Sequence, residues 1–90
     1  MNDLASQVMQ LAERIKPLLA GNPPEVQSAA LGELLSVFLA GHFVINPETG
    51  VVDEDATSEV RGGVLQEITR LAFQLLPLNH SIIMERHLQP

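Results

Sequence analysis

Residues 24–43 of the chain read PEVQSAALGELLSVFLAGHF, and this stretch decides the fold class. Proline at its start and Gly41 near its end predict a single helix over residues 24–43. On a helical wheel its large apolar side chains cover an arc of roughly 220°, against the roughly 100° stripe that a surface helix buries. These side chains are Val26, Leu31, Leu34, Leu35, Val37, Phe38 and Leu39. The helix therefore needs cover on several sides, either from its own chain or from a second copy.

The same stretch carries a row of small side chains spaced by four residues: Ser28, Gly32, Ser36 and Ala40. Small residues at this spacing allow a second helix backbone to approach closely. The alternative is that they fill space without any specific contact. We expect this helix to form the interface between copies, through Gly32, Ser36, Ala40, Leu35 and Leu39.

Two further stretches have the 3-and-4-residue apolar spacing of amphipathic helices. One runs over about 3–20, on Leu4, Val8, Leu11, Ile15 and Leu18. The other runs over about 57–76, on Val60, Val64, Ile68, Leu71 and Leu75. Pro77 disfavours a helical backbone at the residue before it, so a short fourth helix over 78–88 is an option. The sequence predicts an all-α fold in one domain spanning 1–90: a small bundle of three main helices around the apolar helix at 24–43.

An acidic connection over 44–57 separates the second and third predicted helices. Five acidic residues and no basic ones fall within residues 46–60. Asn46–Gly50 reads NPETG, in which Pro47 presets φ and Gly50 can take the positive φ of a turn. Apolar pairs flank this turn, so whether 44–52 forms a β-hairpin stays open. The acidic run lacks the glycine and the terminal glutamate of an EF-hand loop, which predicts a solvated loop without calcium.

Composition limits the partners and the compartment. The net charge is −6, which argues against a nucleic-acid partner because phosphate binding needs clustered Lys and Arg. No cysteine is present, which fits a cytoplasmic protein. The longest apolar run, 34–45, is shorter than the ~20 residues that a membrane span needs, so we expect no membrane partner.

The titratable residues do not have the spacing of a catalytic or metal site. His80 and His87 lie seven residues apart, or about 10 Å along a helix, too far to share one ion. We therefore expect no metal and no cofactor. One weak ligand-binding candidate remains: Arg61, on the apolar side of its helix, together with His42, Asn79 and His80 at predicted helix ends. Arg61 either extends to water at the edge of the bundle or faces a groove that binds an anion.

Two functions follow from these patterns. The first is a small non-enzymatic protein-interaction or regulatory protein that acts as a homo-oligomer and can also bind another protein. The second is a small-ligand binding or catalytic module that uses Arg61 and the nearby histidines on an anionic ligand. The absence of catalytic spacing favours the first. A third alternative is that the acidic residues 48–59 occupy a basic surface of a partner.

Overall fold

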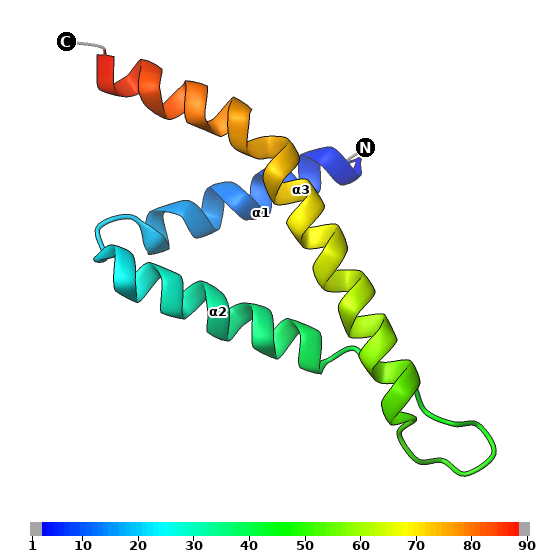
Figure 1. Ribbon diagram of the computed structural model, residues 1–90. Helices are drawn as coiled ribbons and strands as arrows, with labels where there is room; N and C mark the ends of the chain where they lie inside the picture. Colours follow the sequence, from blue (N-terminus) through cyan, green and yellow to red (C-terminus); the bar gives the residue numbers. More distant parts are fainter. Residues whose placement is uncertain (1–2, 89–90) are drawn as a thin grey trace. The chain divides into compact units, whose positions relative to one another are not determined.

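The computed structural model describes residues 3–88 and confirms an all-α fold. Its helices are α1 (Leu4–Leu19), α2 (Pro24–Ala40) and α3 (Glu54–Leu88), as Figure 1 shows. The chain divides into two compact units, Met1–Ser36 and Val37–Pro90, which are described separately below. None of the described helices combines the length and the apolar character needed to cross a membrane.

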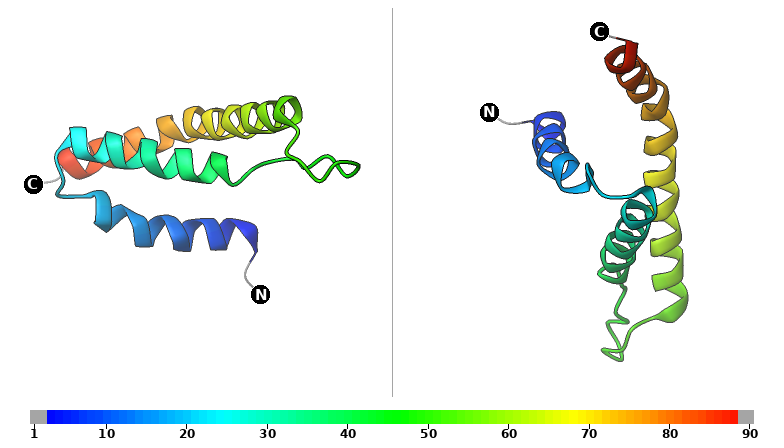
Figure 2. Two further views of the ribbon diagram at one scale, coloured as in Figure 1. Left: turned by 90° about the horizontal axis from the view of Figure 1, so that it is seen from below. Right: turned by 90° about the vertical axis from the view of Figure 1, so that its left-hand side faces the viewer.

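In the first unit, α1 begins where the Asp3 side chain accepts a hydrogen bond from the Ser6 backbone N–H at 2.8 Å. This is the capping that a short acidic side chain supplies to an otherwise unpaired N–H of the first turn. Gly21, with φ +89°, reverses the chain after α1. The Asn22 side-chain amide then donates to the carbonyls of Leu18 and Leu19, which the helix itself leaves unpaired. As a result, α1 and the first part of α2 form a helical hairpin (Figures 1 and 2).

In the second unit, a connection over residues 41–53 joins the end of α2 to α3. Its ends pair through one isolated antiparallel bridge, Ile45 with Val52, so the hairpin left open by the sequence is reduced to a single bridge. The turn closes where the Gly50 N–H donates to the Asn46 carbonyl at 2.8 Å. Gly50 has φ +72°, as its position in the turn predicts.

α3 differs from the prediction at Pro77, because it continues from Glu54 to Leu88 as one helix with the proline inside it. A separate fourth helix over 78–88 is not found in the described residues. Proline removes one backbone hydrogen bond and clashes with the carbonyl four residues earlier, which can bend a helix without ending it. Such a bend is visible between the yellow and orange parts of α3 in Figure 1.

The helix boundaries also shift around the connection. α2 ends at Ala40, three residues earlier than predicted, and α3 starts at Glu54, three residues earlier than predicted. The early start of α3 follows from Asp53, whose side chain accepts a hydrogen bond from the Ala56 N–H at 3.0 Å.

Neither unit has an apolar core of its own. Among the described residues the buried side chain is Thr57, which is 1% exposed, and no apolar side chain is buried. Contacts from one unit can only reduce the exposure of side chains in the other. The absence of a buried apolar side chain therefore also holds for each unit taken by itself. On α2, Leu34 remains 59% exposed and Phe38 52% exposed. A central position for α2 within a bundle therefore stays a prediction.

Candidate functional site

Arg61, the main candidate from the sequence, lies against the C-terminal end of α2. Its Nε donates hydrogen bonds to the carbonyls of Leu39 and His42, both at 3.0 Å. Its Nη2 donates to the carbonyl of Ala40 at 3.1 Å. These carbonyls belong to the last turn of a helix or follow it directly, where no further helical turn follows. The Leu39 carbonyl also accepts a hydrogen bond from the His42 N–H at 3.0 Å. A cation at this end also interacts favourably with the helix dipole.

A second contact joins the connection to the first turn of α3. The Thr57 hydroxyl accepts a hydrogen bond from the Val44 N–H at 3.0 Å. The Val44 carbonyl in turn accepts one from the Asp53 N–H at 2.8 Å. Both backbone groups of Val44 are therefore paired, and Thr57 is buried where they meet. We call residues 39–44 with Asp53, Thr57 and Arg61 the elbow, because they fix how the chain passes from α2 into α3.

The imidazole of His42 is held by the helix that it follows. Its Nδ1 lies 2.8 Å from the Phe38 carbonyl, and its ring meets the Phe38 ring edge-on at a centroid distance of 4.6 Å. The structure thus brings Arg61 and His42 together, but Arg61 contacts the backbone carbonyl of His42. The imidazole is engaged with its own helix end.

Asn79 and His80 lie away from this group. They follow Arg61 by 18 and 19 residues on the same helix, which separates them from it by about 27 Å along the axis. The sequence placed them near Arg61 by assuming a chain break at Pro77, and the continuous helix removes that break. No ligand site formed by all four candidates is therefore assembled within the second unit.

The side chains of the elbow form hydrogen bonds with backbone groups. The three hydrogen bonds from Arg61 go to carbonyl oxygens, and those at Thr57 and Asp53 satisfy N–H groups of the connection and of α3. Such pairing removes the cost of leaving backbone groups without partners. The arrangement is that of a structural junction, with no reacting group placed beside a base.

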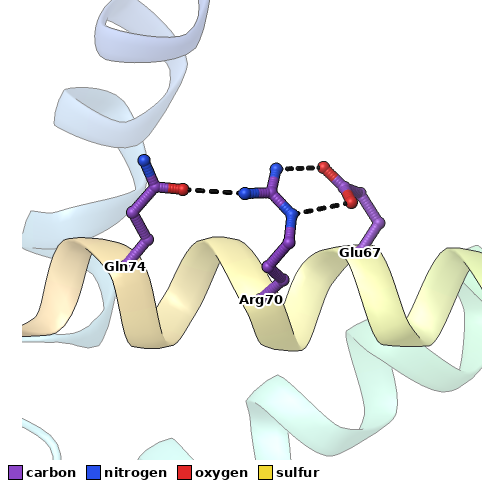
Figure 3. Close-up of polar contacts among 3 residues, drawn as sticks. All are labelled: Glu67, Arg70 and Gln74. Atoms are coloured by element: carbon purple, nitrogen blue, oxygen red, sulfur yellow. Dashed lines mark hydrogen bonds and ion pairs between the residues drawn. The ribbon is translucent and has the colours of Figure 1, made fainter.

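A second polar cluster lies on the exposed surface of α3. Glu67 and Arg70 are joined by two hydrogen bonds, of 2.6 Å and 3.0 Å, and Arg70 also donates to the side chain of Gln74 at 2.9 Å (Figure 3). Hydrogen bonding by Arg70 lowers the pKa of the Glu67 carboxyl below its ordinary value, and the same bonds raise the pKa of Arg70. An exposed pair of this kind contributes little to stability.

The predicted interface residues all lie on α2. Gly32, Ser36 and Ala40 are exposed, while Leu35 and Leu39 are half-buried. A Cβ atom placed on Gly32 would meet no heavy atom within 4 Å, so within the first unit no other helix approaches the small-residue row there. Contact with a second copy along this row stays a prediction.

Two other kinds of site, a metal site and a surface hollow, remain to be considered. No group of three or more His, Asp or Glu side chains in residues 3–88 is placed to hold a metal ion. A shallow hollow at the end of α3 is lined by Ile83, Arg86 and His87, and it brings together one apolar and two basic side chains.

Sequence reasoning missed the roles of Asp53 and Thr57. The sequence pattern places Asp53 in a solvated acidic run, yet its side chain caps α3. Its position three residues before Ala56 is the signal that could have identified it, since capping side chains sit at this distance from the N–H that they accept. Thr57 has no such signal, because its partner lies 13 residues away in the chain.

A scan against protein-family models and searches of curated proteins and of solved structures find no match to this chain. The functional argument therefore depends on the residues and their arrangement.

Proposed function

We propose that this chain acts as a homo-oligomer, a small non-enzymatic interaction or regulatory protein whose copies associate through apolar faces of α2 and α3. The observation that carries the proposal is the absence of a buried apolar side chain among residues 3–88. In a sequence with 46% hydrophobic residues, so much exposed apolar surface indicates an association surface.

The energetic argument points the same way. Fully burying a Val, Leu, Ile, Phe or Met side chain is worth about 1.5–3 kcal/mol. A folded domain needs a net stability of about 5–15 kcal/mol after its conformational entropy has been offset. The described helices bury no apolar side chain, so we expect further association to supply much of that stabilisation. Disulfides cannot supply it, because the chain has no cysteine.

The charge supports a protein as the partner. The net charge of −6 repels a nucleic-acid backbone, and five of the 11 acidic residues lie within residues 46–60, which cover the end of the connection and the first turns of α3. Apolar association through the helices leaves this acidic segment available for a second, basic protein.

The anionic-ligand alternative has less support. Arg61 uses its Nε and Nη2 donors on three backbone carbonyls, and Asn79 and His80 lie about 27 Å from it along α3. An anion at Arg61 would have to compete with the end of α2 for the same guanidinium.

Light scattering on the full chain at micromolar concentration tests the proposal. The expected mass is a multiple of the 9.8 kDa of one chain. Far-UV circular dichroism on dilution should show helicity falling with the oligomer, because association and folding are linked by mass action. A monomer of 9.8 kDa that keeps its helicity and unfolds cooperatively would show that the chain covers its own apolar surface, and would overturn the proposal.

A further inference from the structure

We draw no further inference here: the strongest candidate, the apolar stripe that runs along α3 from Val64 through Leu71 to Ile82, carries nothing because nothing in the structure shows what covers it.

Discussion

At the residue scale, Arg61 shows how one side chain can join two helices. A helix that ends leaves its last carbonyls short of N–H partners, and here a single guanidinium supplies three donor contacts to carbonyls at the end of α2. One of them, the Leu39 carbonyl, also accepts from the His42 N–H. A lysine has one nitrogen and lacks this planar fork of donors. Arg61 lies on the apolar side of its helix, and the sequence leaves open whether its side chain extends to water or binds an anion. The structure explains this position, because the partners of Arg61 are backbone carbonyls at the end of another helix.

Arg61→Met should reduce the free energy of unfolding by about 1.5–3 kcal/mol, because hydrogen bonds to a charged group are lost and the carbonyls at the end of α2 lose the guanidinium as a donor. Urea denaturation at fixed protein concentration measures this. Arg61→Lys should fall between Met and the native chain. The exposed Arg14→Met is the control and should change stability by less than about 0.5 kcal/mol. Equal effects of Arg61→Met and Arg14→Met would show that the elbow contacts are unimportant.

The Glu67–Arg70 pair predicts the sign of one pH effect. Because Arg70 lowers the pKa of Glu67 in the folded chain, the pair's contribution to stability is present above the ordinary Glu value of 4.5 and is lost as pH falls through the lowered pKa. An NMR titration of the Glu67 side-chain carboxyl should place its pKa below 4.5. In Arg70→Gln the pKa should return toward the ordinary value. An unchanged pKa in that variant would mean that the pair does not persist in solution.

At the element scale, α3 is the decisive segment, because its 35 residues continue through Pro77. The proline removes the N–H that would bond the Phe73 carbonyl, so the helix is weakened and bent near its middle. Continuity nonetheless keeps the apolar side chains before and after the proline on one stripe. A break at Leu76 would have turned Leu78 and Ile82 into part of a separate short helix.

Pro77→Ala should therefore restore a backbone hydrogen bond and increase the free energy of unfolding by about 1–3 kcal/mol. Far-UV circular dichroism should show equal or higher helicity, and urea denaturation gives the stability. Pro17→Ala, in the last turns of α1, is the comparison, and we expect a smaller gain there because helix ends are already frayed. A loss of stability in Pro77→Ala would indicate that the bend itself is required for packing.

At the scale of the whole molecule, the main feature is apolar surface that neither unit buries. α1, α2 and α3 each present large apolar side chains with more than a third of their surface exposed. The homo-oligomer proposed above would cover this surface through contacts between copies.

Gly32→Leu tests whether the small-residue row on α2 takes part in the contact between copies. Within the first unit the position is open, and replacing glycine in a helix by leucine should favour the helix by up to about 1 kcal/mol. If copies meet along this row, the larger side chain overpacks the contact at a cost of about 1–3 kcal/mol. Light scattering should then show a smaller or weaker oligomer. Gly32→Ala is the control, because it adds helix propensity with little volume. An unchanged oligomer and a higher melting temperature in both variants would mean that the row faces solvent.

The sequence by itself determined the helical nature of the chain. The spacing of Leu4, Val8 and Leu11, the prolines before Glu25 and the turn at Asn46–Gly50 are local signals, and local backbone preferences are enough to read them. That α3 crosses Pro77 is known only from the structure. Tertiary contacts decided two further things: that Arg61 pairs with the end of α2, and that Thr57 pairs with Val44. Arg61 and its carbonyl partners are 19–22 residues apart, and Thr57 and Val44 are 13 apart. Such contacts depend on how the connection folds back on α3, which no periodicity within a single helix encodes.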